Sequence, residues 1–226
     1  MKISEIFESI QGEGNNAGKP AVFLRTAECN LKCVWCDTKY TWDWKNYDYS
    51  KEVNEMSIKE VRQSLEQFRI RHLVITGGEP LMQQDDLAEL VTFLKPEFYV
   101  EVETNGTILP NNALSTLVDQ WNVSPKTKNS GNPLDMCEVN ECYTFFSKKK
   151  NCYFKYVVES EDDLIEINQF ISKYSLEKDR ILLMTQAITK EEILAKENSV
   201  FTISKKNSLG FSPRLHVMKW GSQRGK

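Results

Sequence analysis

Three cysteines stand close together near the start of this 226-residue chain. Cys29, Cys33 and Cys36 follow the spacing C-x3-C-x2-C, which places three thiolates on one short segment. Such a segment can hold three irons of a 4Fe–4S cube and leave the fourth iron without a protein ligand. A small molecule with suitable donor atoms can then bind that iron. The spacing therefore predicts an iron–sulfur site with one open corner.

Other uses of the cysteines remain open from the sequence. Cys33 and Cys36 with Cys137 and Cys142 have a spacing that a structural zinc site tolerates. A ferredoxin-like carrier is less favoured, because the close fourth cysteine and following proline of the bacterial run are missing. Cys137, Cys142 and Cys152 fit no common cluster spacing, so we interpret them as small buried side chains.

The charge and hydropathy patterns exclude several classes of protein. The chain has 29 Lys and Arg against 32 Asp and Glu, a net charge of −3, which argues against nucleic-acid binding by bulk charge. No apolar run approaches the roughly 18 residues that span a bilayer, and Glu5, Glu8 and Glu13 interrupt the start where a secretory segment would lie. We therefore expect a cytoplasmic protein that binds neither nucleic acid nor membrane. In that reducing compartment, six cysteines favour metal or redox chemistry over disulfides.

Short apolar runs alternate with helical patterns along the chain. The runs predict strands at residues 21–26, 72–76, 98–104, 121–124, 152–158 and 180–184. Apolar residues at helical spacing predict helices near 58–68, 87–94 and 164–174, and Ser57 with Glu60 and Thr189 with Glu192 have capping-box spacing. The alternation predicts one α/β domain over residues 1–226, built as a partial (βα)6 barrel around a mostly parallel sheet. We expect a last strand at Arg214–Met218, where side chains alternate.

Residues suited to chemistry follow the predicted strands. The cysteine segment follows the first strand, and Gly77-Gly78-Glu79-Pro80 follows the second. Glu103 closes the third strand, and Ser124-Pro125-Lys126 follows the fourth. Because ligands bind at the carboxyl edge of parallel sheets, these groups are expected to share one site. Glu101 lies on the same strand face as Glu103, although it could equally lie at the surface.

With these elements placed, the C-x3-C-x2-C segment and Gly77-Gly78-Glu79-Pro80 resemble the radical S-adenosylmethionine (SAM) superfamily, which carries that segment after the first strand of a partial barrel. The resemblance implies a 4Fe–4S cluster on Cys29, Cys33 and Cys36, whose open iron is chelated by the amine and carboxylate of SAM. It also implies that Gly78, Glu79 and the Ser124-Pro125-Lys126 segment line the SAM site.

Three further segments resemble the 7-carboxy-7-deazaguanine synthase family within that superfamily. They are Ile10-Gln11-Gly12-Glu13-Gly14, Phe23-Leu24-Arg25-Thr26 and Trp35-Cys36-Asp37-Thr38, and Leu215-His216 resembles the ending of some members. The resemblance implies conversion of 6-carboxy-5,6,7,8-tetrahydropterin to 7-carboxy-7-deazaguanine with loss of ammonia, in queuosine biosynthesis. It further implies a homodimer reduced by an electron-transfer protein such as a flavodoxin or ferredoxin.

The same resemblance implies roles for single residues in a core domain that carries a substrate-binding extension (1–20) and a C-terminal strand and tail (200–226). Glu103 is expected to accept from a SAM hydroxyl or the substrate, and Thr38 to bind Mg²⁺. The implied substrate-binding residues are Ile10, Gln11, Gly12, Arg25, Thr76 and His216. Lys155 either faces the cavity or is an edge lysine, and His72 is expected to pack in the core.

Two alternative functions remain open at this point. A radical SAM activating enzyme has the same cysteine segment but acts on a partner protein, and the Gln11-Gly12-Glu13-Gly14 pattern with Thr38 argues against it. A non-catalytic, zinc-stabilised interaction protein belongs to another class. Visible absorbance from an iron–sulfur cluster after anaerobic reconstitution distinguishes the enzymes from a protein that holds only zinc.

Overall fold

The apolar runs of the sequence form the parallel strands of one sheet. The computed structural model describes all residues, 1–226, and confirms the six predicted strands to within one or two residues at each end. These strands are β2 (Pro20–Thr26), β4 (His72–Gly77), β5 (Tyr99–Thr104), β6 (Gln120–Val123), β7 (Cys152–Val158) and β8 (Ile181–Thr185). Each pairs in parallel with the next, as a βα barrel requires.

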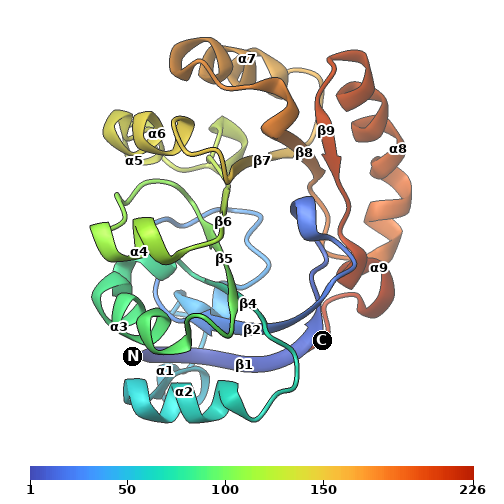
Figure 1. Ribbon diagram of the computed structural model, residues 1–226. Coiled ribbons are helices and arrows are strands. Elements are labelled where there is room, and N and C mark those ends of the chain that lie inside the picture. Colours follow the sequence, from blue (N-terminus) through green and yellow to red (C-terminus); the bar gives the residue numbers. More distant parts are fainter.

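Three further strands complete the sheet. They are β1 (Lys2–Ile10), β3 (Asn54–Glu55) and β9 (Gly210–Ser212), and the strand order is β3-β1-β2-β4-β5-β6-β7-β8-β9. β1 runs antiparallel to both β2 and β3, whereas β9 is parallel to β8. The sheet is curled into an incomplete barrel, with the helices on its outer side (Figure 1). The predicted α/β fold, mostly parallel sheet and single domain are therefore confirmed.

The predicted strand at Arg214–Met218 is wrong, because this segment forms the helix α9 (Leu215–Trp220). The last strand, β9, ends just before Pro213, whose nitrogen carries no hydrogen to donate to a sheet. In the helix, Val217 packs against Ala187 and Ile193, with Met218 at the edge of the cluster. Four alternating residues are too short a pattern to separate strand from helix.

Helices connect the strands and cover the outer face of the sheet. The helices between successive parallel strands are α2 (Ile58–Glu66), α3 (Gln84–Leu94), α4 (Asn112–Leu117), α6 (Asn140–Ser147), α7 (Asp163–Tyr174) and α8 (Lys190–Lys206). Shorter turns of helix lie at α1 (Tyr49–Glu52), α5 (Leu134–Cys137), η1 (Gly14–Asn16), η2 (Lys39–Thr41), η3 (Pro80–Gln83), η4 (Lys128–Ser130) and η5 (Lys178–Arg180). Both predicted capping boxes form, at the starts of α2 and α8. None of the helices combines the length and hydropathy that crossing a bilayer requires.

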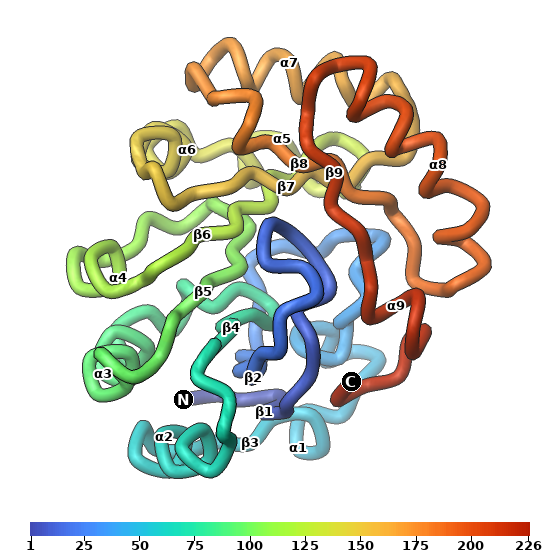
Figure 2. The backbone as a smooth tube through the Cα atoms, turned by 45° about the vertical axis from the view of Figure 1, so that its right-hand side comes forward, coloured from blue at the N-terminus to red at the C-terminus, as the bar shows by residue number.

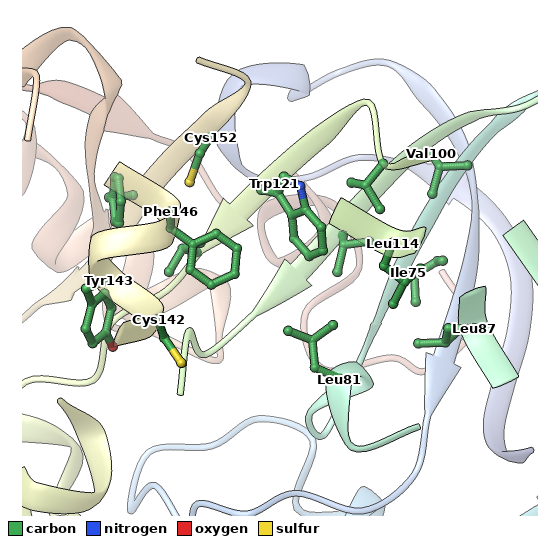
Figure 3. Packing of buried hydrophobic residues seen from close by; sticks show 14 of the residues in the cluster. Ile75, Leu81, Leu87, Val100, Leu114, Trp121, Cys142, Tyr143, Phe146 and Cys152 are labelled. Carbon is green, nitrogen blue, oxygen red and sulfur yellow. The ribbon is translucent and has the colours of Figure 1, made fainter. Parts of the chain in front are cut away.

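The main hydrophobic core lies between the outer face of the sheet and these helices. It contains 37 buried residues, with Trp121, Tyr143 and Phe146 among the largest (Figure 3). Cys142 and Cys152 lie among them and are buried, in agreement with their interpretation as small core side chains. The apolar side chains of this core therefore lie on the outer face of the strands, whereas the inner face carries polar residues together with a small apolar cluster of Ala21, Phe23 and Val74.

The connection between β1 and β2 enters the curl of the sheet. In Figure 2 this segment, with η1, is surrounded by the strands rather than lying outside them. It contacts β7 and β9 through η1, and Asn16 reaches Glu101 of β5. The inner side of the barrel is thus partly filled by residues 11–19, which we call the inner loop.

Candidate active site

One cavity opens at the carboxyl edge of the parallel strands, where the sequence placed the chemistry. Its lining contains every predicted site residue except Glu79 and Pro125. The site residues that it brings together are Ile10, Gln11, Gly12, Arg25, Cys29, Cys33, Cys36, Thr38, Thr76, Gly78, Glu103, Ser124, Lys126 and His216. They come from five strands or their following loops and from both ends of the chain, so only the folded barrel assembles them.

The three cysteines all line the cavity, and each sulfur has an N–H donor. Cys29 Sγ accepts from the backbone of Leu31 at 3.4 Å, Cys33 Sγ from Asn132 Nδ2 at 3.2 Å and Cys36 Sγ from Trp42 Nε1 at 3.4 Å. Such N–H donors stabilise the negative charge of cluster thiolates. The residues present therefore fit a cluster that uses three thiolates and faces the cavity.

Burial opposes ionisation of these thiols when no metal is bound. It raises the pKa of Cys29 to about 12, and raises that of Cys33 although the charge of Lys126 partly compensates. Metal coordination overcomes such a barrier because it deprotonates a thiol directly. The four cysteines of the zinc alternative are not brought together: Cys137 packs beside Cys33, but Cys142 belongs to the main core.

The loop after β6 supports the cysteine segment by hydrogen bonds. The backbone of Val34 donates to Ser130 O at 2.9 Å, and that of Lys32 to Asn132 Oδ1 at 2.8 Å. Trp35 Nε1 donates to Asn129 O at 3.0 Å. Residues 128–132 therefore hold the segment from one side, and no sequence motif indicated this role.

The two glycines after β4 allow an unusually close approach between loops. A Cβ atom at Gly78 would lie 2.0 Å from the carbonyl oxygen of Glu28, and Gly77 has φ +141°. In their place, the backbone of Gly78 donates to Thr26 O at 3.1 Å and that of Glu79 to Glu28 O at 2.8 Å. Side-chain-free backbone is thus what lets the second loop pack directly onto the cysteine segment.

Glu79 does not line the cavity. Its carboxylate is fully buried and accepts from Thr104 Oγ1 at 2.8 Å and from the backbones of Leu81 at 3.0 Å and Asn105 at 2.7 Å. Burial raises the pKa of this carboxyl above its ordinary value despite these donors. Glu79 therefore joins the loops after β4 and β5, and its neighbour Gly78 lines the cavity.

Charged side chains form a network on the inner side of the cavity. Glu13 is ion-paired with Lys155 and with Arg214, the latter at 2.9 Å, and Arg214 also pairs with Asp37. Burial alone raises the pKa of Glu13, but the charges of Lys155, Arg214 and His216 outweigh it and hold the pKa well below its usual range. The sequence left two positions open for Lys155, and the structure shows that it faces the cavity.

Glu103 lies at the centre of this network. It accepts from Thr76 Oγ1 at 2.8 Å, and its other oxygen lies 3.5 Å from Lys155 Nζ. His216 reaches the same region from α9: its Nε2 lies 3.7 Å from Glu13, and its ring packs on Gly12, where a Cβ would be 2.0 Å from Nδ1. The wrong strand prediction for the tail therefore did not misplace His216 with respect to the cavity.

Arg25 is a partly buried cation with one side already engaged. Its Nε donates to Glu5 Oε2 at 2.9 Å, and Tyr40 donates to the same oxygen at 2.8 Å. No hydrogen bond within the protein engages its two terminal amino groups, and the residue lines the cavity. Arg25 therefore offers a planar pair of donors suited to a ligand carboxylate.

Glu101 is buried on the floor of the barrel and not at the surface. It accepts from Gln11, Asn16 and His72 at 2.7, 2.6 and 2.9 Å, and from Asn122. His72 is partly buried, and it serves as a partner of Glu101 as well as a packing residue. Sequence reasoning also missed Glu13, Arg214 and Asp37 as cavity residues, because their partners are distant in the chain.

Comparisons with known proteins agree with this geometry. A profile described as the Radical SAM superfamily matches residues 23–124. The 7-carboxy-7-deazaguanine synthase of Pyrobaculum aerophilum is 38% identical over 100% of this chain and 97% of its own, and that of Hyperthermus butylicus is 30% identical over 96% and 92%. The crystal structure of QueE from Escherichia coli aligns with a TM-score of 0.73 at 25% identity, covering 95% and 94% of the two chains.

The fold and the three-cysteine site define a radical SAM enzyme, with the 4Fe–4S cluster and SAM that this superfamily uses. Structures of SuiB from Streptococcus suis share the fold at 17% identity, over 84% of this chain and 47% of theirs, with a TM-score of 0.57. Full-length similarity is more specific: the chain belongs to the 7-carboxy-7-deazaguanine synthase family.

Proposed function

We propose that this protein converts 6-carboxy-5,6,7,8-tetrahydropterin to 7-carboxy-7-deazaguanine with loss of ammonia, as a carbon–nitrogen lyase of the queuosine pathway. Membership of the family supports the reaction. The single observation that best supports the substrate is that one cavity joins the three-cysteine segment to the unpaired side of the partly buried Arg25 guanidinium.

Cys29, Cys33 and Cys36 would hold the cluster, and Gly78, Ser124 and Lys126 lie where SAM would bind beside it. When bound, the cluster and SAM supply the organic radical that takes hydrogen from the substrate. Lys126 Nζ donates to Ser124 O and Oγ at 2.8 Å and lies over the ring of Trp35 at 5.6 Å. These contacts keep a positive charge beside the cysteines without placing an extra ligand on them.

The chain's own residues would bind and orient the pterin. Arg25 would donate from its two terminal amino groups to the substrate carboxylate. The extension formed by residues 1–20 would contribute Ile10, Gln11 and Gly12 to the pterin ring, with Thr76 and His216 completing the contacts. Lys155 balances the charges of Glu13 and Glu103, so that Glu103 can accept from a SAM hydroxyl or from the substrate.

A divalent cation is proposed to bind at Thr38, which lines the cavity two residues beyond Cys36. One protein hydroxyl with substrate oxygens and waters is a ligand set that suits Mg²⁺, because this ion keeps several of its waters. Thr38→Ala is expected to weaken the stimulation of turnover by Mg²⁺ while SAM still binds, which titration of the metal and equilibrium SAM binding measure. Unchanged Mg²⁺ dependence in this variant removes Thr38 from the site.

We also propose two protein partners, an electron donor and a second copy of this chain. Reduction of the cluster needs an electron-transfer protein such as a flavodoxin or ferredoxin, which we expect to meet this enzyme in the cytoplasm. A homodimer is proposed from the family resemblance, and sedimentation of the reconstituted protein measures it.

The decisive experiment is anaerobic incubation of the reconstituted protein with SAM, a strong reductant, Mg²⁺ and the carboxytetrahydropterin, followed by mass spectrometry. The expected product is 7-carboxy-7-deazaguanine. Cys33→Ala, which removes a cluster ligand, is the matched control and should give neither cluster absorbance nor product. Absence of the deazaguanine from a fully loaded protein overturns the proposed function.

A further inference from the structure

None of the inner loop belongs to a strand, so side chains must help to hold it in shape. Gln11, Gly12 and Glu13 line the cavity, while Asn16 lies deeper and does not. The loop is closed on itself by two backbone bonds, from Gln11 N to Lys19 O at 2.8 Å and from Gly18 N to Gln11 O at 2.7 Å. These bonds define the loop but do not fix its position in the barrel.

Glu101 connects the inner loop to the sheet. Within the loop, Gln11 Nε2 and Asn16 Nδ2 donate to its carboxylate at 2.7 and 2.6 Å. On the sheet, His72 Nε2 lies 2.9 Å away on β4, and Asn122 of β6 donates to the same carboxylate. One carboxylate thus gathers the loop and three adjacent strands.

Further hydrogen bonds join the amide side chains that surround Glu101. Asn16 Nδ2 also donates to Gln120 Oε1 at 3.1 Å, and Gln120 Nε2 donates to Asn122 Oδ1 at 3.1 Å. A buried carboxylate is costly unless donors surround it, and apolar residues of similar size would stabilise the fold at least as well. The charge at position 101 is therefore better explained by the inner-loop amides that it binds than by a contribution to overall stability.

Gln11 connects Glu101 to the cavity, because it binds Glu101 and also lines the cavity. Glu101 accepts a hydrogen bond from the amide nitrogen of Gln11. The amide oxygen of Gln11 therefore points away from Glu101 and accepts from the backbone of Glu13 at 3.2 Å. Gln11 Nε2 also lies 3.4 Å from Glu103 Oε1. The orientation of one amide therefore links Glu101, which lies below the cavity, to the carboxylate of Glu103 and to the backbone of Glu13 within it.

We propose that Glu101 is a positioning residue that sets the pterin-binding shape of the inner loop without touching the substrate. The inference rests on the proposed function, since it assigns the inner loop to the pterin. A glutamine at position 101 keeps the size of the side chain but turns an N–H group toward at least one of the donors that now point at it. Gln11 and Asn16 then lose the acceptor that orients their amides, while the ion pairs of Glu13 and the bond from Leu215 N to Gly12 O keep the loop inside the barrel. The cysteine segment and the SAM side of the cavity are unaffected.

Glu101→Gln is the first test, in the cluster-loaded enzyme. The KM for the carboxytetrahydropterin should rise about 10-fold, the loss expected for one charged hydrogen bond, while kcat changes much less. SAM affinity and iron content should equal those of the unaltered protein. In the protein without ligands, backbone amides of residues 11–18 should exchange hydrogen faster in the variant.

Asn16→Ala tests the same inference from a residue outside the cavity. It should raise the pterin KM in the same direction, and the double variant should be little worse than Glu101→Gln alone, because both changes break one connection. Asp119→Asn is the matched control: Asp119, just before β6, binds Lys95 and the backbone of Val100 and makes no hydrogen bond to the inner loop. It should lower stability and leave the pterin KM unchanged.

The outcomes separate the two proposals. An unaltered enzyme that makes no deazaguanine contradicts the proposed function. An active enzyme in which Glu101→Gln leaves the pterin KM and the exchange of residues 11–18 unchanged contradicts the positioning role. Equal losses of pterin and SAM binding in Glu101→Gln and Asp119→Asn also contradict it, because they indicate general destabilisation.

Discussion

Ionic side chains in the cavity are paired with residues far away in the chain. Glu13 pairs with Lys155, 142 residues later, and with Arg214, 201 residues later. Arg25 pairs with Glu5 of the neighbouring strand. Each ion is thereby oriented before a ligand arrives, which reduces the entropy that binding must overcome.

Arg25 provides the sharpest prediction at the scale of a residue. Arg25→Lys keeps the charge but loses the planar pair of donors, so kcat/KM for the pterin should fall about 10- to 100-fold. SAM binding should not change, as equilibrium dialysis can measure. Glu5→Gln, which loosens the hold on Nε, should give a smaller loss in the same direction. A lysine variant with unchanged kcat/KM would show that the substrate carboxylate binds elsewhere.

Glu13 predicts a dependence of stability on pH. Its pKa is lowered in the folded protein by Lys155, Arg214 and His216 against the effect of burial, with Glu103 and Asp37 competing for the same cations. A carboxyl with a lowered pKa stabilises the fold above its unfolded pKa and loses that contribution as pH falls. The unfolding free energy of the unaltered protein should therefore fall below about pH 5.

Glu13→Gln should flatten that acid limb and also lower stability at pH 7, by about 3 kcal/mol, because it removes the carboxylate that Lys155 and Arg214 share and leaves them only Glu103 and Asp37. Urea unfolding at a series of pH values measures both effects. Parallel acid limbs in the two proteins would contradict the lowered pKa.

At the scale of elements, the loop after β4 packs on the cysteine segment by direct contact of the two backbones, with no side chain between them. Gly78→Ala places a Cβ 2.0 Å from Glu28 O, a backbone atom that cannot move without the cysteine segment. We expect a loss of about 3 kcal/mol in unfolding free energy and poor cluster incorporation. Gly18→Ala is the control, since it has φ +91° but no atom within 4 Å, and should cost about 1 kcal/mol from backbone strain alone.

Local patterns predicted most of the elements but not all. The strands β2, β4, β5, β6, β7 and β8 were predicted because apolar runs buried on the outer face have a plain signature. β1 was not, because Glu5 and Glu8 interrupt its apolar pattern and only pairing with β2 and β3 reveals it as a strand. The helix α9 was mistaken for a strand because the contacts of Val217 with Ala187 and Ile193 cannot be seen in the chain itself.

At the scale of the whole molecule, the core and the cluster ligands are separate. None of the three cluster cysteines belongs to the 37-residue core. We therefore expect the protein with Cys29, Cys33 and Cys36 all replaced by Ala to keep its far-UV circular dichroism and cooperative unfolding, while visible absorbance disappears. A triple variant that is unfolded at 25 °C would mean that the cluster is required for the fold.

The sequence by itself determined what depends on spacing and periodicity. The three cysteines, the two glycines after β4 and the alternation of strands and helices are local patterns, and a parallel sheet brings loop residues to one edge whatever the details. These patterns were enough to predict the α/β sheet and the edge at which the cavity lies. The family resemblance, rather than spacing, selected Ile10, Gln11, Gly12, Arg25, Thr38, Thr76 and His216. Of all the residues selected in these two ways, only Glu79 and Pro125 do not line the cavity.

Only the tertiary structure decided which charges meet and which are buried. Glu79 and Glu101 turned out to be buried hubs, and Glu13, Lys155 and Arg214 became partners, because the curl of the sheet and the entry of the inner loop bring distant segments together. Burial and ion pairing depend on distances in space, and those distances follow from packing of the whole chain rather than from any short stretch of it.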